Sequence, residues 1–489
     1  MPAKAPDSGF ELDLVRPPAG VRRLLHDLHR QLRSAIADGR LQPGLRLPST
    51  RAFARQFGIS RNTALALYDL LLADGYLEAR PGSGTFVAQG LRREAGTAGG
   101  TNPYDPRIAP QWREAATFLP AQDAPQFDLR LGLPDRSLFP FDVWRRLSNR
   151  VVRELARAPS SYRNAQGSPA LRAAIARHIS FTRAVACRAE DVVAAAGAQQ
   201  GFDLIARLLV TPGETVAAVE DPGYPPLRAA FRAAGARIVP VPVDGEGVRV
   251  DVIPDEARII CVTPSHQFPT GVAMSLQRRM ALLERARAID ASIVEDDYDS
   301  EFRFSSRPLD ALQTLDRSGS VFYVGTFSKC LFPELRLGFV VAPAWALAGL
   351  AEVRRVSGWH GPVQDEEALA AFIDEGHLAR YVRRMRKEYS ARRHALIDAL
   401  SRHCRQSLRL IPSAAGLHLA VELIVPVAAA EVAAAARELG VAVDTLDRYS
   451  VGHAPMQGLA LGFGQIAAGK LDAAAQLLQQ AIYACLRQG

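Results

Sequence analysis

The stretch VFYVGTFSKCLFPELRLGF, residues 321–339, determines how the larger part of this chain folds. Its apolar runs at 321–324 and 338–341 predict two short buried strands. The loop between the two strands holds Lys329. An ammonium enclosed between buried strands is costly to desolvate unless it is neutralised or paired. A lone lysine more often extends its charge to solvent instead.

Three neighbours of Lys329 carry groups that suit a phosphate monoester. Thr326 and Ser328 offer hydroxyls, and Arg336 offers a fixed cation. A lysine amine beside a phosphate site favours pyridoxal 5'-phosphate, because the aldehyde of that cofactor bonds covalently to an amine. The neighbours of Lys329 therefore favour a cofactor site over a surface lysine.

The segment IVEDDYD, residues 293–299, begins as a buried strand and ends in acids. At strand spacing, Asp296 and Tyr298 lie on one face. A carboxylate there would keep the pyridine nitrogen of the cofactor protonated, and the phenol would bond the ring hydroxyl. The alternation of strand faces favours Asp296 for the nitrogen, with Asp297 as the alternative.

These two stretches resemble the fold-type I aminotransferases. Three further stretches carry the same resemblance: TPSHQFPTG (263–271), EDPGYPP (220–226) and AGAQQGFDL (196–204). The resemblance covers residues 127–489, where strand-like and helix-like segments alternate as in an α/β domain with a largely parallel sheet. From about residue 364 we expect a small α+β C-terminal domain.

The resemblance also implies roles for two tyrosines. Tyr224 would stack on the cofactor ring, although by itself it would be assigned to packing on a sheet edge. Tyr162 would come from a neighbouring subunit and approach the phosphate. The backbone amides of Ala198 and Gln199, at the start of the helix after a strand at 192–196, are a natural phosphate site.

Two departures from the aminotransferase pattern concern ligand recognition. Many relatives have Asn-Pro-Thr-Gly where this chain has HQFPTG at 266–271, so His266 or Gln267 would take over the asparagine's contact with the ring hydroxyl. An arginine for the substrate carboxylate is expected near the final strand. Residues 459–461 are Leu-Ala-Leu, and Arg448 is the nearby substitute.

Residues 16–90 predict helices followed by a hairpin. Residues 21–38 have an apolar helical face. Ser49 and Ser60 are candidate N-caps of two further helices, and residues 80–84 form a glycine-rich hairpin tip. This layout is typical of a winged helix-turn-helix. Residues 16–93 hold 13 Arg, no Lys and five acids, so they carry the whole net charge of +8. That charge favours a polyanionic partner.

Two parts of this layout would meet nucleic acid. The start of the third helix carries side chains of the types that reach base edges and phosphates, namely Ser60, Arg61, Asn62 and Thr63. The hairpin tip would bring its backbone to the minor groove through Gly82, Ser83 and Gly84. A protein-binding module with the same layout is the alternative.

The stretch LPSTRAFARQFGISRNTALALYDLLLADGYLEARPGSGTFVA, residues 47–88, resembles the GntR family. The resemblance implies a double-stranded operator DNA as partner. Ser49 and Arg51 would contact the DNA backbone, Arg61 and Thr63 would read bases, and Gly82 would enter the minor groove.

Residues 91–126 are rich in Gly, Ala and Pro and lack periodicity. We expect them to link a DNA-binding domain at 16–90 to an aminotransferase-like domain at 127–489. Fully extended, the linker would span roughly 100 Å or more. Because fold-type I sites are built at a two-fold interface, the resemblance implies a homodimer, in which each head could reach its partner's body.

A GntR-like head fused to an aminotransferase-like body is the form of the MocR-type regulators, which this chain resembles over nearly its whole length. We expect a transcription regulator that senses pyridoxal phosphate, or a small amine or amino acid reacting with it, and not a physiological enzyme. One alternative is a working aminotransferase whose head only tethers it. A scaffold without cofactor is disfavoured, because Lys329, Tyr298 and Arg336 are present.

The composition predicts the cellular compartment of the protein. No run of eighteen apolar residues occurs, and the start lacks a charged-then-apolar signal, so we expect no membrane partner. The five cysteines are scattered and odd in number. They argue against disulfides and a metal site and for the cytoplasm.

Overall fold

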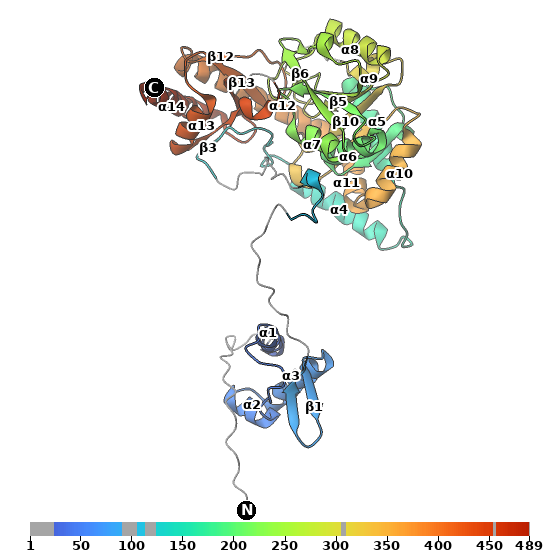
Figure 1. Cartoon of the computed structure of the whole chain (residues 1–489), viewed down its shortest axis with the longest axis vertical. Coiled ribbons are helices and arrows are strands. Elements are labelled where there is room, and N and C mark those ends of the chain that lie inside the picture. The colour runs from blue at the N-terminus through green and yellow to red at the C-terminus, as the bar shows by residue number, and fades with distance from the viewer. Residues whose placement is uncertain (1–23, 90–104, 113–123, 305–309, 453–455, 489) are drawn as a thin grey trace, which may run out of the picture. The chain divides into compact units, whose positions relative to one another are not determined.

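The computed structural model of the protein describes residues 24–89, 105–112, 124–304, 310–452 and 456–488 (Figure 1). The chain divides into two compact units, Met1–Ala109 and Pro110–Gly489. Most of the expected linker and the expected helix start at Val21 lie outside the described residues. In the described part of the chain, no helix has the length and apolar character needed to cross a membrane.

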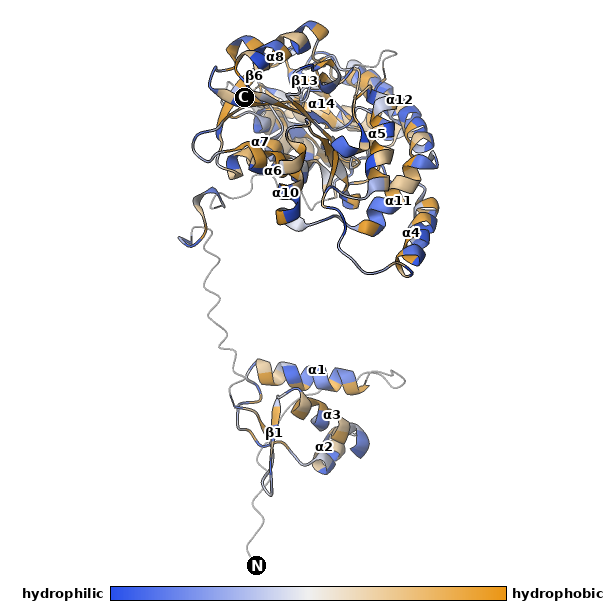
Figure 2. Cartoon of the chain, turned by 90° about the vertical axis from the view of Figure 1, so that its right-hand side faces the viewer, coloured by the Kyte–Doolittle hydropathy of each residue, from blue (hydrophilic) through white to orange (hydrophobic). Residues whose placement is uncertain are grey.

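The first unit folds as helices followed by a hairpin, and the expected winged helix-turn-helix is confirmed. Its elements are α1 (Leu24–Ala37), α2 (Thr50–Gln56), α3 (Arg61–Ala73), β1 (Leu77–Arg80) and β2 (Gly84–Val87). The polar and apolar sides of α1 are visible in Figure 2. Its apolar residues Leu28 and Leu32 form one buried cluster with Phe53 of α2 and Leu67 of α3. β1 and β2 pair antiparallel.

Both expected serine N-caps are confirmed. The Ser49 hydroxyl accepts a hydrogen bond from the backbone N–H of Ala52 at 3.2 Å, and the Ser60 hydroxyl accepts one from that of Thr63 at 3.0 Å. A cap of this kind stabilises a helix by about 1 kcal/mol. The caps fix where α2 and α3 begin, and each helix presents an exposed arginine in its first turn.

The second unit is built on an eight-stranded sheet with the order β4-β11-β10-β9-β8-β5-β6-β7. Neighbours from β10 to β6 run parallel, whereas β11 is antiparallel to both of its neighbours and β7 to β6. The strands are β4 (Val192–Ala195), β5 (Val216–Asp221), β6 (Arg237–Asp244), β7 (Gly247–Val248), β8 (Ala257–Val262), β9 (Ser292–Asp297), β10 (Val321–Thr326) and β11 (Gly338–Val341). The expected largely parallel sheet is confirmed, and the carboxyl ends of its parallel strands meet at one edge.

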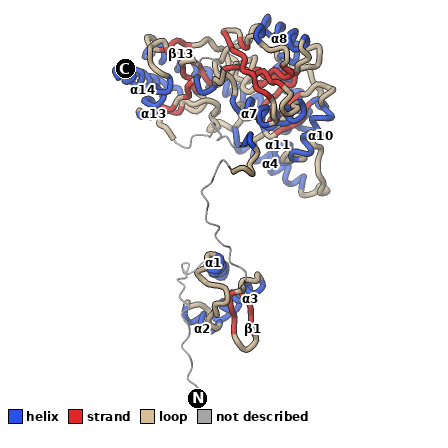
Figure 3. The backbone as a smooth tube through the Cα atoms, in the orientation of Figure 1, coloured by secondary structure: helices blue, strands red, loops and turns tan. Residues whose placement is uncertain are grey.

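Helices cover both faces of this sheet, as Figure 3 shows. Successive strand residues point to opposite faces. Val294 and Val324 therefore pack with α6, α7 and α10, whereas Ile293 and Val321 pack with α8 and α9. The helices are α4 (Phe141–Leu155), α5 (Pro169–Arg183), α6 (Gly197–Leu209), α7 (Pro225–Ala233), α8 (Leu276–Ala288), α9 (Leu312–Leu315), α10 (Leu347–Gly358), α11 (Val363–Asp374) and α12 (His377–His403).

The C-terminal part contains a four-stranded antiparallel sheet with the order β12-β13-β16-β15, packed with helices. Its elements are β12 (Leu408–Leu410), β13 (His418–Leu423), α13 (Ala429–Glu438), β15 (Asp444–Thr445), β16 (Gly458–Gly462) and α14 (Leu471–Gln488). The small α+β domain expected from the sequence is therefore confirmed.

The segment at Phe127 joins this C-terminal part, a contact that the sequence did not predict. β3 (Phe127–Asp128) pairs in parallel with β14 (Val441–Ala442). The carbonyl of the next residue, Leu129, accepts a hydrogen bond from the backbone N–H of Gly462 at 2.6 Å. The chain therefore passes through the C-terminal domain before it enters the large one.

Candidate functional site

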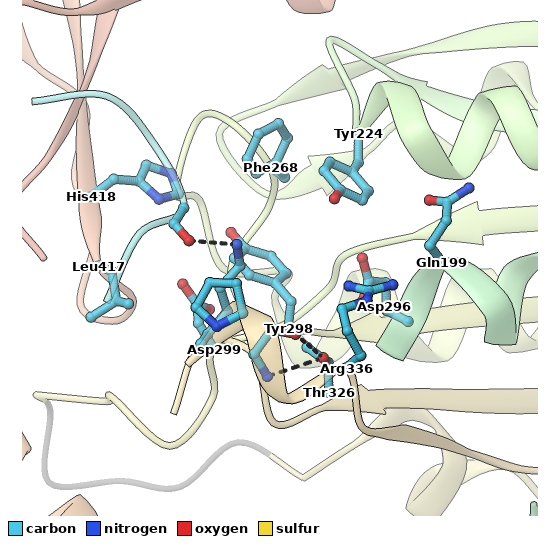
Figure 4. A pocket seen from close by; sticks show the side chains of 15 residues that line it. Gln199, Tyr224, Phe268, Asp296, Tyr298, Asp299, Thr326, Arg336, Leu417 and His418 are labelled. Carbon is cyan, nitrogen blue, oxygen red and sulfur yellow. Dashed lines mark hydrogen bonds between the residues drawn. The ribbon is translucent and has the colours of Figure 1, made fainter. Parts of the chain in front are cut away.

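A pocket of about 160 Å³ opens where β9 and β10 end, beside the start of α6 (Figure 4). The predicted site residues that line it are Ala198, Gln199, Tyr224, Asp296, Tyr298, Thr326, Ser328, Lys329 and Arg336. They are far apart in the sequence and converge because parallel strands end at the same edge of the sheet.

Lys329 follows β10 and is partly buried. Its Nζ donates a hydrogen bond to the carbonyl of Gly132 at 2.7 Å. Burial lowers the pKa of Lys329, and the nearby Asp299 and Asp296 oppose that shift. A lowered pKa favours the neutral amine, which is the nucleophilic form.

The backbone at Gly132 favours glycine. Its φ is +88°, a left-handed conformation that side chains disfavour, and a Cβ built there would lie 2.8 Å from Lys329 Nζ. The close approach of the backbone lets the carbonyl hold the lysine amine.

Donors for an anion gather at the start of α6. The N-cap residue Ala196 offers no side-chain cap, so the first amides of the helix have no such partner. Arg336 reaches across and donates from Nη2 to the carbonyl of Ala196 at 2.7 Å. A Cβ on Gly197 would lie 3.2 Å from both terminal guanidinium nitrogens. The hydroxyls of Thr326 and Ser328, 3.1 Å apart, complete a cradle of phosphate size and charge.

The structure separates the two adjacent carboxylates at the end of β9. Asp296 lines the pocket, and its buried Oδ1 has no hydrogen-bond partner among the described residues. Burial and then the charge of Asp297 raise the pKa of Asp296 well above its usual range. Asp297 points to the other face, where it accepts bonds from Arg183 Nε at 2.7 Å and from the Tyr323 hydroxyl at 2.5 Å. A protonated ring nitrogen in the pocket would give Asp296 the partner it lacks.

His266 lies behind Tyr298 and is absent from the residues that line the pocket. Its Nδ1 is 3.0 Å from a carboxylate oxygen of Asp299 and 2.9 Å from the Tyr298 hydroxyl. Because an ionised carboxylate only accepts, Nδ1 carries the proton. The Tyr298 hydrogen is then available to a ligand. Gln267 instead donates from Nε2 to the carbonyl of Phe268 in its own loop at 2.6 Å and to that of Pro222, after β5, at 2.8 Å.

Besides His266, two predicted site residues stay outside the pocket of their own chain. Tyr162 is 77% exposed, and its ring centroid lies 4.9 Å from that of Trp359. Arg448 forms an ion pair with Asp444. Tyr162 was expected to serve a neighbouring subunit, and Arg448 was expected to bind a substrate carboxylate. Both roles stay predictions.

The sequence did not single out several residues that line the pocket: Gly132, Phe268, Asp299, Pro333, Leu417 and His418. Asp299 belongs to the acidic run after β9, and that run was the one signal that could have identified it. The donor atoms of His266, Asp299 and His418 lie within 4.8 Å of one another, a spacing that a metal ion could use. All three residues already form hydrogen bonds. His266 Nδ1 lies 3.0 Å from a carboxylate oxygen of Asp299, and His418 Nε2 lies 3.0 Å from the carbonyl of Pro269.

The candidate DNA surface lies on the first unit. Ser49, Arg51, Ser60, Arg61, Asn62, Gly82, Ser83 and Gly84 are exposed. Thr63 is half-buried, and its hydroxyl is 2.8 Å from that of Ser60. At the hairpin, Gly82 and Gly84 have φ values of +74° and +117°. A Cβ on Gly84 would lie 3.0 Å from Arg46 Nε, so the Arg46 guanidinium lies beside the hairpin tip.

Comparison with known proteins matches both units. Residues 25–87 match the bacterial regulatory proteins of the gntR family, and residues 127–455 match aminotransferase class I and II. The LysN α-aminoadipate aminotransferase of Thermus thermophilus, complexed with N-(5'-phosphopyridoxyl)-L-leucine, is similar in structure. It has a TM-score of 0.68 and 27% identity, over 74% of this chain and 93% of that one.

Two regulators are similar over most of their length. The probable rhizopine catabolism regulatory protein MocR of Rhizobium meliloti is 38% identical over 448 residues, which is 90% of each chain. The pyridoxine biosynthesis transcriptional regulator PdxR of Corynebacterium glutamicum is 32% identical, over 89% of this chain and 91% of that one. With its GntR-type head and aminotransferase-type body, the chain belongs to the MocR-type transcription regulators.

Proposed function

We propose that this DNA-binding transcription regulator holds pyridoxal phosphate in the pocket at Lys329, and that a small amine or amino acid reacting there changes its affinity for operator DNA. One observation carries the proposal. The buried Asp296 Oδ1 has no partner among the described residues and faces the same pocket as a lysine amine and an uncapped helix start. These three groups suit the ring nitrogen, the aldehyde and the phosphate of one cofactor.

The residues of the chain have distinct parts in this proposal. Pyridoxal phosphate would supply an electrophilic aldehyde on an electron-withdrawing ring. Asp296 holds the proton on the ring nitrogen, and Tyr298, positioned by His266, donates to the ring hydroxyl. Arg336, the hydroxyls of Thr326 and Ser328, and the amides of Ala198 and Gln199 bind the phosphate.

Tyr224 covers one face of the ring in this proposal. It lines the pocket, and its ring lies edge-on to Phe268 with the centroids 5.1 Å apart.

The proposal includes a homodimer. Tyr162 is 77% exposed in the single chain, which leaves it accessible to a partner, and the resemblance to fold-type I aminotransferases favours a role at the phosphate end of the partner's pocket. A two-fold dimer also presents two heads to a repeated half-site.

The test measures cofactor binding and operator binding in one titration. Apo-protein is titrated with pyridoxal phosphate while the absorbance and the anisotropy of a labelled operator duplex, selected from random sequence, are followed. We expect a new visible to near-ultraviolet band and a change in operator affinity of about 5–150-fold, the usual range of coupling. A band without any change in affinity, together with transamination turnover, would favour the aminotransferase alternative.

Arg61 is expected to govern operator choice. Replacing it by alanine should cost about 1–3 kcal/mol on the selected duplex and much less on a scrambled one, because a bidentate base contact is lost. Arg51→Ala is the matched control. It should weaken both duplexes equally and reduce the salt slope by about 0.9, as expected for one phosphate contact. Equal weakening of both duplexes by Arg61→Ala would exclude a base-reading role.

A further inference from the structure

The pocket retains polar groups that the cofactor does not use. Asp296, Tyr298 and the cradle around Arg336 are assigned to the ring and the phosphate, and Lys329 to the aldehyde. Asp299, His418 and the backbone of Gly132 also line the pocket, beside the apolar Leu417 and Phe268 (Figure 4). These groups face whatever reacts with the cofactor.

Each of the remaining polar groups accepts hydrogen bonds. The Asp299 carboxylate only accepts. His418 Nε2 lies 3.0 Å from the carbonyl of Pro269 and must donate to it, so in a neutral ring Nδ1 is an acceptor. Burial lowers the pKa of His418 well below its usual value, which keeps the ring neutral. The carbonyl of Gly132 becomes free to accept once Lys329 turns to the cofactor.

The described residues bring no further cation to the pocket beyond Lys329 and Arg336. Arg448 is paired with Asp444 outside it. Leu459 and Leu461, where an arginine was expected, are fully buried in the antiparallel sheet. Among the described residues of one chain, a ligand carboxylate would therefore meet Asp299 without a counter-charge, and like charges in such proximity oppose binding.

We infer that the amine recognised here carries a second hydrogen-bond donor, a hydroxyl or an ammonium, in place of a carboxylate. Amino alcohols and diamines are the two forms of this chemistry. The inference rests on the proposed function, since it concerns the compound that reacts in the same pocket. It assigns the specificity to Asp299 and His418.

Three compounds with the same chain length test the inference: 3-aminopropan-1-ol, 1,3-diaminopropane and β-alanine. Each is titrated into full-length protein loaded with pyridoxal phosphate, and the absorbance of the cofactor and the heat of binding are recorded. We expect the alcohol and the diamine to bind at least about tenfold more tightly than β-alanine, equivalent to ~1.4 kcal/mol. Equal or tighter binding of β-alanine would overturn the inference.

Asp299→Asn adds a second readout. It should reduce the preference for 1,3-diaminopropane over β-alanine, whereas Asp142→Asn, a surface control with a 90% exposed side chain, should leave it unchanged. The wild-type series decides the matter even if the variant folds poorly. Failure of the protein to bind cofactor would contradict the proposed function and this inference together. Cofactor binding with β-alanine preferred would contradict the inference alone.

Discussion

Full-length protein in which Lys329 is replaced by alanine is expected to lose the covalent cofactor adduct that borohydride traps. Lys329 is the one lysine among the residues that line the pocket, and its lowered pKa favours the nucleophilic amine. The chain has four lysines, so peptide mass spectrometry after reduction identifies the modified residue without ambiguity. The visible band of the cofactor should vanish with the adduct.

Lys387→Ala is the matched control for this experiment. Lys387 is exposed on α12, and its loss should leave trapping unchanged. Trapping at full stoichiometry in Lys329→Ala would assign the covalent bond to another amine and reject the proposed site.

Replacing Asp297 by alanine should destabilise the second unit by about 3–5 kcal/mol, because removal of one partner leaves a buried charge uncompensated. Arg183 and Asp297 have side chains only 6% and 1% exposed, with Nε and Oδ2 2.7 Å apart. All four tryptophans lie in residues 112–359, so their fluorescence during urea unfolding follows this unit alone.

Asp203→Ala provides the comparison for Asp297. Its pair with Arg207 on α6 is also short, at 2.8 Å, but the side chains are 38% and 56% exposed. A pair of that kind contributes about 0.3–0.5 kcal/mol. Similar losses in the two variants would show that burial does not set the strength of the Asp297 pair.

Strand alternation made part of the site predictable. Because side chains change face at every residue, Asp296 shares a face with Val294, and the structure places it in the pocket while Asp297 turns to Arg183. The strand at 338–341 was predicted to the residue. The strand expected at 321–324 continues to Thr326, because Thr326 still pairs with Gly338.

The remaining wall of the pocket could not be predicted from local pattern. Gly132, Leu417 and His418 reach it from distant parts of the chain, and only the tertiary fold brings them to Lys329. The pairing of β3 with β14 could not be predicted from the sequence, for a related reason. Each strand has two residues, too few to show a periodic signal.

The entry segment at Phe127 connects Lys329 to the C-terminal domain, because β3 pairs with β14. Five residues after Phe127, the chain reaches Gly132, whose carbonyl holds the Lys329 amine at 2.7 Å. A reaction that consumed this amine would release the carbonyl of Gly132 and remove this hydrogen bond between the entry segment and the loop of Lys329. The contact between the entry segment and the loop of Lys329 would then depend on the chemical state of one amine.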